Sequence, residues 1–483
     1  MSLRYFLSRP APGHLPERLL SASSSRAGRS FFSSPDGITV AGIGEAAVIE
    51  ADGADRIQAL ASGANALLDG LADVGDGNAR PVLVGGFGFA GEPARRGPWA
   101  GWSAGRLVLP EVALVDRDGD CQMVAVAPPG MAHADAAAWL DQRVSQALHD
   151  LVGGAARPAP GPTETVGAAT QAAWGFVADA GRGAPARPIP MAASAGGLAM
   201  VEVASPIREA RAANDPYEEL VGDGLRAIRT GQVDKVTLAR SRRFGRVRRT
   251  APGAVLGSFA RHYPRCFRFW IQPAGQSAFA GASPERLVAR QGLDARADAL
   301  AGTVGRSDEA AADANLGALL LANNKERREH EAVVGFLRER LGRFSASGEV
   351  DAARVPGLRK LANVQHLHTP VNVRLPKKDT PGILDLAAAV HPTPAVAGVP
   401  AEAATEWIGT HEDLDRGWYS GGVGVVEQGG DGELCVAIRS GLFERDALWL
   451  FAGAGVVSGS DPAREAREVE QKMRALRDLL VEG

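Results

Sequence analysis

The stretch NDPYEELVGDGLRAIRTGQVDKVTLAR, residues 214–240, contains the signals for a helix followed directly by a strand. Asn-Asp-Pro at its start is a helix cap with proline at the first helical position, and Gly231 ends the helix. From Val233 onward apolar and polar residues alternate with the period of a strand, so Lys235 and Thr237 share one face with Val233. The stretch therefore predicts one helix and one strand joined by a short turn.

The same two patterns continue through the rest of the chain. Further strands are expected at 267–272, 278–283, 286–290, 298–303, 362–374, 421–427, 433–443 and 447–456. One long helix is expected from Asn315 to Leu341, and a last helix from Asp461-Pro462 to about Leu480. The first half adds apolar runs at 81–84 and 106–115 and a helix at 135–151. Runs of strands interrupted by long helices predict an α+β fold rather than a regular βαβ alternation.

The composition is that of a globular protein. Hydrophobic residues make up 45% and charged residues 23% of the 483 residues. A formal net charge of -3 gives no sign of a nucleic-acid or membrane partner. No apolar run approaches the roughly 18 residues of a membrane span. Cys121, Cys266 and Cys435 lie far apart without metal-ligand spacing, so we expect reduced thiols in a cytoplasmic protein.

The domain organisation is expected to be simple. We expect residues 31–483 to form one domain, with the catalytic motifs in 205–483. Residues 154–163 and 181–195 are rich in alanine, proline and glycine and predict loops. Residues 1–30 are rich in arginine and serine with one acidic residue, which suits a poorly ordered leader, our preferred interpretation, or a targeting segment.

One glycine pattern is a false lead. Gly86–Gly91 matches GxGxxG after an apolar run. The dinucleotide-binding form of this motif requires a helix to begin there, and Pro93 and Pro98 argue against one. We therefore expect no dinucleotide site.

Lysine is rare in this chain, which draws attention to each one. Of 53 basic residues only six are lysine. Arginine keeps its proton, whereas a desolvated lysine can act as a base. Lys235 lies just before a run of arginines, so we mark it as a residue whose chemistry arginine could not supply.

Two pairs of glutamates recur at i, i+3 on the two expected long helices. Glu326 and Glu329 form one pair, and Glu465 and Glu468 form the other. On the last helix this pair and Lys472 lie beside the expected buried row, where carboxylates need a cation or a hydrogen-bond donor. Carboxylates on two helices could bind Mg²⁺, but each pair alone is more often a solvated face.

Several motifs, in one order and spacing, decide between these interpretations. They are Val233–Arg240, Gly281–Arg286 (GASPER), Leu300–Thr303 (LAGT), Lys325–His330 (KERREH), His391–Val396 (HPTPAV), Asp415–Gly421 (DRGWYSG), Ala437–Ser440 (AIRS), Ala452–Gly455 (AGAG) and Ser460-Asp-Pro leading into Glu468–Lys472. Together they resemble the chorismate-binding enzymes, over about residues 205–483. Phe31–Pro35 and Val84–Phe87 resemble the weaker N-terminal pattern of the isochorismate synthases in that family.

The resemblance implies a fold and a metal. The fold is that of anthranilate synthase component I, an α+β domain with two large sheets enclosed by helices and a cleft between them. The metal is Mg²⁺, with Glu329 and Glu468 matching its direct ligands. Glu326 and Glu465 match the glutamates that orient metal-bound water.

The resemblance also implies a substrate pocket for chorismate, a dianion. Arg439 and Tyr419 match the residues that hold the enolpyruvyl carboxylate. Gly453 and Gly455 would let backbone N–H groups approach an anion. Gly302, Thr303 and Lys472 match residues that surround the ring carboxylate. His391 matches a histidine of the pocket, and we leave its role open.

Two further residues match an acid–base pair. Lys235 matches the base of the branch that adds water to chorismate, and to act so its pKa must be depressed by desolvation and the nearby Mg²⁺. Glu285 matches the acid that protonates the departing C4 hydroxyl, so its pKa should be raised. These matches imply an isomerase, isochorismate synthase, acting as a monomer on a small-molecule substrate.

Alternatives remain at this point. Aminodeoxychorismate synthases carry a nucleophilic lysine before the Gly-Thr turn, where this chain has Ala301. Salicylate synthase, anthranilate synthase component I and a non-catalytic binding relative stay open as less favoured interpretations. The pathway that would use isochorismate, menaquinone or siderophore synthesis or salicylate, is not written in the sequence.

Overall fold

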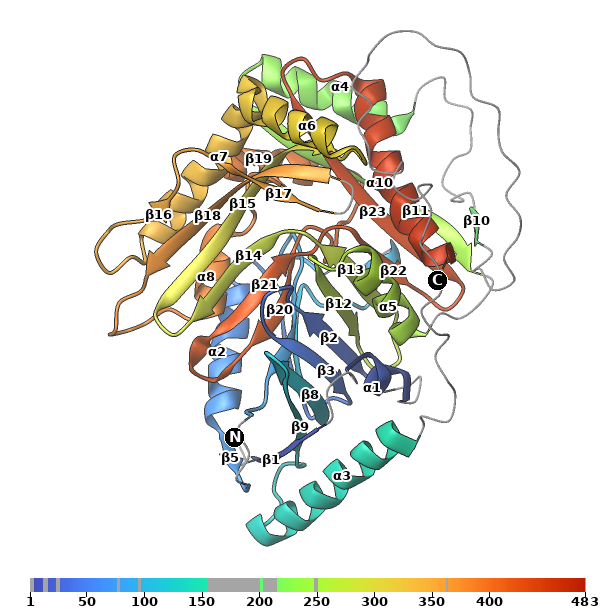
Figure 1. The fold of residues 1–483 in the computed structure, drawn as a ribbon, viewed down its shortest axis with the longest axis vertical. Coiled ribbons are helices and arrows are strands. Elements are labelled where there is room, and N and C mark those ends of the chain that lie inside the picture. The colour runs from blue at the N-terminus through green and yellow to red at the C-terminus, as the bar shows by residue number, and fades with distance from the viewer. Residues whose placement is uncertain are drawn as a thin grey trace.

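Two large β-sheets form the centre of the molecule, with helices over their outer faces (Figure 1). The computed structural model describes residues 4–11, 16–22, 27–75, 79–93, 97–153, 200–202, 215–246, 251–361 and 364–482. The predicted loops at 154–163 and 181–195 lie outside these residues. The α+β prediction is confirmed.

The larger sheet contains 13 strands among the described residues. They are β1 (Arg4–Pro10), β2 (Arg29–Ser33), β3 (Thr39–Ile43), β5 (Leu71–Asp73), β8 (Val112–Arg117), β9 (Asp120–Val126), β10 (Met200–Glu202), β11 (Lys235–Arg246), β12 (Phe267–Gln272), β13 (Ala278–Ser283), β19 (Gly398–Val399), β22 (Ser440–Phe443) and β23 (Ala447–Val457). Their order is β10-β11-β23-β22-β13-β12-β2-β3-β8-β9-β1-β5, with β19 paired to β11.

The second sheet contains 10 strands in the described part of the chain. They are β4 (Ala47–Ala51), β6 (Leu83–Phe87), β7 (Gly105–Leu109), β14 (Arg286–Gln291), β15 (Asp294–Gly305), β16 (Asp351–Ala352), β17 (Gly357–Lys360), β18 (Val364–Arg374), β20 (Gly422–Val426) and β21 (Gly432–Val436). Their order is β16-β18-β15-β14-β21-β20-β6-β7-β4, with β17 paired to β18.

The helices are short to medium in length. They are α1 (Pro16–Ala22), α2 (Arg56–Asp69), α3 (His133–Gly153), α4 (Pro216–Arg229), α5 (Pro252–His262), α6 (Ala310–Ala322), α7 (Asn324–Gly342), α8 (Ile383–Val390), α9 (Ala401–His411) and α10 (Pro462–Glu482), with 3-10 turns η1 (Gly97–Trp99) and η3 (Gln428–Gly430). Asp215 caps α4 as predicted, its carboxylate accepting from Tyr217 N at 3.0 Å.

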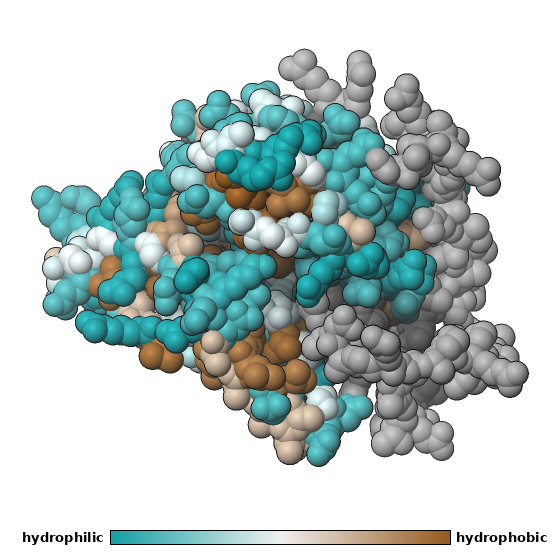
Figure 2. Space-filling view, turned by 90° about the horizontal axis from the view of Figure 1, so that it is seen from above, coloured by the Kyte–Doolittle hydropathy of each residue, from teal (hydrophilic) through white to brown (hydrophobic). Residues whose placement is uncertain are grey.

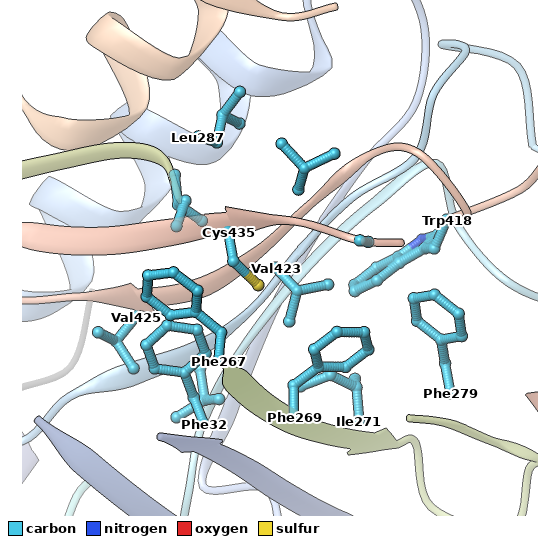
Figure 3. Packing of buried hydrophobic residues seen from close by; sticks show 14 of the residues in the cluster. Phe32, Phe267, Phe269, Ile271, Phe279, Leu287, Trp418, Val423, Val425 and Cys435 are labelled. Atoms are coloured by element: carbon cyan, nitrogen blue, oxygen red, sulfur yellow. The ribbon is translucent and has the colours of Figure 1, made fainter. Parts of the chain in front are cut away.

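The core lies between the two sheets. Aromatic side chains of the larger sheet, among them Phe32, Phe267 and Phe269, face Val423 and Cys435 of the second sheet (Figure 3). Each of these five side chains is essentially inaccessible to solvent. Burial of this apolar surface is what holds the sheets together.

Two predicted elements are divided in the structure. The helix expected over 315–341 is two helices, because Asn323 is extended and its side chain accepts from the backbone N–H groups of Lys325 and Glu326, which starts α7. The strand expected over 433–443 is also two, β21 and β22, one in each sheet. Arg439, with a φ of 54°, lies at the crossing point.

The N-terminal residues differ from the leader that their composition suggested. β1 pairs antiparallel with β9, with Phe6 opposite Val126, and Leu19 and Leu20 of α1 are buried. The described part of residues 1–30 therefore belongs to the fold, because its apolar side chains complete the core. The GxGxxG sequence starts at the end of β6, and among the described residues after it the next helical element is the three-residue turn η1.

Candidate active site

Strands β11 and β23 carry the first predicted site residues. The two strands are antiparallel, with Thr237 opposite Gly455 and Ala239 opposite Gly453. A Cβ at position 455 would lie 2.8 Å from Lys235 Cε, and one at 453 would lie 2.7 Å from the Leu238 carbonyl oxygen and 3.3 Å from the Tyr419 hydroxyl. Gly455 therefore makes room for the Lys235 side chain, and Gly453 makes room for the β11 backbone and the Tyr419 hydroxyl, roles that the sequence did not suggest.

A cavity of about 160 Å³, here the inner cavity, collects most of the predicted substrate residues. Its lining includes Thr237, Ala239, Glu285, Thr303, Ala395, Val396, Arg416, Tyr419, Arg439, Gly453, Gly455 and Lys472. Tyr419 stacks on Phe451 with ring centroids 5.5 Å apart, and burial raises the pKa of its phenol to about 12. The hydroxyl thus remains a hydrogen-bond donor at neutral pH.

A second cavity of about 520 Å³, here the outer cavity, adjoins the first. Its lining includes Lys235, Gly302, Glu326, Glu329, Glu465 and Glu468, and it shares Thr303, Gly455 and Lys472 with the inner cavity. It lies between the first turns of α7 and α10, next to Leu319 of α6, which is 59% exposed. On the face of the molecule seen from above, apolar residues lie in hollows among hydrophilic ones (Figure 2).

Glu285 is the buried acid of the site. It follows β13, is 4% exposed, and its carbonyl accepts from Val436 N at 3.0 Å. Burial, reinforced by the charge of Asp298 and partly offset by Lys235 and Arg359, raises the pKa of Glu285 from an ordinary 4.5 to about 8. The raised pKa that the resemblance implied is therefore present.

Asp298 stays ionised although its side chain is fully buried. Although burial opposes ionisation, His368 and the neighbouring arginines lower its pKa far below the ordinary value. Arg286 Nη1 and Arg359 Nη1 lie 3.1 and 3.0 Å from its carboxylate, and His368 Nε2 lies 3.3 Å from it. A fixed negative charge therefore lies in the neighbourhood of Glu285.

The outer cavity brings the four predicted glutamates together with three lysines, Lys235, Lys325 and Lys472. Glu329 Oε2 is 3.6 Å from Lys235 Nζ, and Glu468 Oε1 is 2.8 Å from Lys472 Nζ. Burial raises the pKa of Glu326 and of Glu465, and in each case the other glutamate of its pair raises it further. The two carboxylates within each pair thus repel each other.

These carboxylates fit a hard divalent cation. Among the described residues, no three carboxylate, histidine or thiol side chains converge into a cage of ligands. Mg²⁺ does not require one, because it keeps several waters and is typically bound by one or two protein carboxylates plus substrate oxygens. A cation between the two pairs would relieve the repulsion that raises the pKa of Glu326 and Glu465.

Three residues of the inner cavity were missed from the sequence. Thr237, His366 and Arg416 line it, and His366 Nδ1 is 2.9 Å from Thr303 Oγ1. Burial lowers the pKa of His366 to about 3, so its imidazole is neutral. The pairing of β15 with β18 sets Thr303 opposite His366, and this pairing could not be read from either strand alone.

His391 is the predicted substrate residue that the structure does not place in the site. It lines neither cavity, and its Nε2 donates to the carbonyl of Phe89 at 3.2 Å. Its ring also packs against Phe87, with centroids 5.0 Å apart, and burial lowers its pKa to about 3. Aromatic packing and a backbone acceptor hold the ring outside the lining of these two cavities, and a role for His391 in substrate binding stays a prediction.

The other 13 predicted residues line the two adjoining cavities. The model of the family described as "Chorismate binding enzyme" matches residues 7–172 and 198–481. The chain belongs to the chorismate-binding enzyme family.

Two curated relatives are named as isochorismate synthases. A stretch of 266 residues is 42% identical to the "Salicylate biosynthesis isochorismate synthase" of Pseudomonas aeruginosa, covering 55% of this chain and 54% of that protein. A stretch of 264 residues is 35% identical to the "Isochorismate synthase MenF" of Escherichia coli, covering 55% and 60%. The chain thus matches only a little over half the length of these curated relatives.

Solved structures share the whole fold. The structure of MenF from Escherichia coli superposes with a TM-score of 0.74 at 23% identity, covering 99% of this chain and 95% of that one. Anthranilate synthase component I from Streptococcus pneumoniae gives 0.65 at 19%, covering 92% and 93%. The predicted anthranilate synthase component I-like fold is confirmed. In the described residues, no helix is both long and apolar enough to cross a membrane.

Proposed function

We propose that this protein is an isochorismate synthase, which adds water at C2 of chorismate and releases the C4 hydroxyl. The observation that carries the proposal is a buried glutamic acid, Glu285, held protonated in a cavity that continues to Lys235. Exchange of a hydroxyl between two ring carbons requires a base that takes a proton from water and an acid that protonates the leaving hydroxyl.

The proton balance follows from these two residues. Lys235, as the base, takes one proton from the attacking water as its oxygen bonds to C2. Glu285, as the acid, gives one proton to the C4 hydroxyl, which leaves as water while the ring double bond shifts. One water is consumed and one is released, so the overall reaction is an isomerisation.

The remaining residues of the two cavities bind the dianion. Arg439 and Tyr419 lie together in the inner cavity and offer a fork of N–H donors and a hydroxyl to the enolpyruvyl carboxylate. Thr303 and Lys472 belong to both cavities, a position suited to the ring carboxylate. Glu329 and Glu468 would bind Mg²⁺ directly, and Glu326 and Glu465 would orient its water ligands. The ion would neutralise the charge of the ring carboxylate.

The names of the relatives support the water-adding branch. Salicylate synthase and anthranilate synthase component I remain the competing functions, and Ala301 still argues against aminodeoxychorismate synthase. The three cysteines are buried and unpaired, which supports our expectation of a cytoplasmic enzyme. We leave the destination of isochorismate open between menaquinone, siderophore and salicylate synthesis.

The proposal is tested by incubating the purified protein with chorismate and Mg²⁺ and separating the products by liquid chromatography. We expect isochorismate approaching an equilibrium mixture with chorismate, with no dependence on ammonium and loss of the product in EDTA. Salicylate with pyruvate would move the chain to the lyase branch. Anthranilate formed only with ammonium, or no product at all, would overturn the proposal.

A further inference from the structure

A buried ion pair between Glu412 and Arg416 closes one wall of the inner cavity. The side chains are 1% and 3% exposed, respectively. Arg416 Nε and Nη2 donate to the two carboxylate oxygens of Glu412 at 2.6 and 2.7 Å. The Phe89 ring lies on the guanidinium, with its centroid 4.4 Å from Cζ. A bidentate pair covered by an aromatic ring has little freedom to move.

The pair also completes the hydrogen bonding of β11 where the neighbouring strand ends. β19 pairs with β11 at Lys235 and Val236, and Thr237 N then donates to Ala397 O at 2.8 Å. Beyond this point Arg416 Nη2 donates to the Thr237 carbonyl at 2.7 Å, and Ala239 N donates to Glu412 Oε2 at 3.0 Å. Two charged side chains therefore take the place of a strand along the edge of β11.

A third contact ties this edge to another wall of the cavity. Arg416 Nη1 donates to the carbonyl of Val396 at 3.0 Å, and Val396 and Ala395 line the inner cavity. Residues two apart on a strand share one face, so Lys235, Thr237 and Ala239 all project from the same side of β11. The guanidinium thus joins the strand that carries Lys235 to the segment facing the substrate.

We propose that the Glu412–Arg416 pair is a positioning device that sets the place of Lys235 and of the Ala395–Val396 wall relative to the substrate. This inference rests on the proposed function, in which Lys235 is the base. Of the groups expected to hold the substrate carboxylates, Arg439, Thr303 and Lys472 lie outside the 412–416 segment, whereas the backbone N–H of Tyr419 donates to the Arg416 carbonyl at 2.9 Å. Disturbing the pair should therefore slow the chemical step more than it weakens substrate binding.

The test compares Arg416→Lys with a matched substitution elsewhere. Lysine keeps the charge but cannot reach Glu412, Thr237 and Val396 together. The control is Arg106→Lys on β7: Arg106 is 8% exposed, bonds Glu45 Oε2 at 3.0 Å and also Glu50, and lines neither cavity.

Turnover is the first measurement. We expect Arg416→Lys to lower kcat about 10- to 100-fold with KM changed less than about threefold. Arg106→Lys should lose a similar amount of melting temperature and keep its kcat. Equal kcat in the two variants, or a rise in KM at unchanged kcat, would overturn the positioning role.

A spectroscopic measurement separates this inference from the proposed function. The chain has six lysines, so reductive methylation with ¹³C-formaldehyde gives a small set of NMR signals, and the Lys235 signal is the one missing in Lys235→Arg. Arg416→Lys and Glu412→Gln should shift that signal, and Arg106→Lys should not. If the protein without substitutions fails to turn over chorismate, the proposed function is wrong. If the Lys235 signal does not shift in either Arg416→Lys or Glu412→Gln, the positioning role of the Glu412–Arg416 pair is wrong.

Discussion

The inner and outer cavities differ in the burial and the charged neighbours of their glutamates. Glu285 in the inner cavity is 4% exposed, has no cationic partner within ion-pair distance among the described residues, and remains protonated near neutral pH. Glu329 and Glu468 in the outer cavity are partly exposed and each lies beside a lysine. The same residue type is therefore a buried acid in one cavity and, in our proposal, a metal ligand in the other, and the surroundings decide which.

The largest expected effect comes from removing the acid. Glu285→Gln keeps the shape of the side chain, but a neutral amide is too weak an acid to protonate the leaving hydroxyl. We therefore expect kcat to fall about 10²- to 10⁴-fold. Substrate binding, measured by quenching of tryptophan fluorescence on titration with chorismate, should change little.

The control for this variant is Glu427→Gln, because Glu427 is another glutamate whose pKa is raised by burial and it lines neither the inner nor the outer cavity. Its kcat should equal that of the unmodified protein. A Glu285→Gln variant with full activity would remove the distinction between the two cavities.

Removing a carboxylate from the outer cavity should act through the metal instead. Glu468→Gln or Glu329→Gln should raise the Mg²⁺ concentration for half-maximal activity by about 10- to 100-fold, because a charged oxygen ligand is lost. Activity measured against Mg²⁺ concentration, with calorimetric titration of Mg²⁺, reports this directly.

Glu470→Gln is the matched change on the same helix. Glu470 lines neither cavity and pairs with Arg242 at 3.4 Å. Its Mg²⁺ response should be unchanged. If Glu470→Gln and Glu468→Gln weakened the response equally, general loss of negative charge rather than ligation would be responsible.

The alkaline side of the pH dependence of kcat should report the inner cavity, where Glu285 lies. Glu285 acts in its protonated form, so kcat should decrease as pH rises through about 8. Asp298→Asn removes a negative charge that raises the pKa of Glu285, so this alkaline limb should move to lower pH. If the alkaline decrease in kcat occurs at the same pH in Asp298→Asn, Asp298 has no effect on the pKa of Glu285, and burial alone raises it.

The smallest expected effect is on stability. Because the pKa of Glu285 in the folded protein lies above its ordinary 4.5, its contribution to stability is fully present below that value and decreases as pH rises toward 8. Glutamine has no proton to lose, so Glu285→Gln should flatten this part of the stability profile. Urea unfolding at several pH values between about 5 and 8 measures the slope, and parallel profiles for the two proteins would contradict the assignment.

Much of the fold was predictable where local signals act alone. The cap and proline before α4, the alternation in β12 and β13, and Asp461-Pro462 before α10 are encoded within a few residues. The break at Asn323 was missed because the residues that follow it are mostly good helix formers, while the cap depends on the backbone conformation of one residue. The assembly of the strands into two sheets depends on contacts between distant segments and came only from the family resemblance.

The candidate site shows the same limit. Its charged residues could be named in advance because their chemistry is specific and their motifs are spaced as in the family. His391 has the expected residue type and motif, yet the acceptor that holds it, the Phe89 carbonyl, is 302 positions away in the chain. Arg416 stood in a quoted motif, but its role depends on Thr237 and Val396, which no local pattern connects to it.

The interleaving of the two sheets limits how this chain can be divided. β2 lies between β3 and β12 in one sheet (Figure 1). In the other sheet, β6 lies between β7 and β20. A fragment that began near residue 205 would keep every predicted site residue but would expose the edges of β12 and β20, which are interior strands of the intact sheets, and exposed strand edges favour aggregation. The N-terminal half is therefore a folding partner supplied in the same chain, and its pairing with distant strands predicts slow folding.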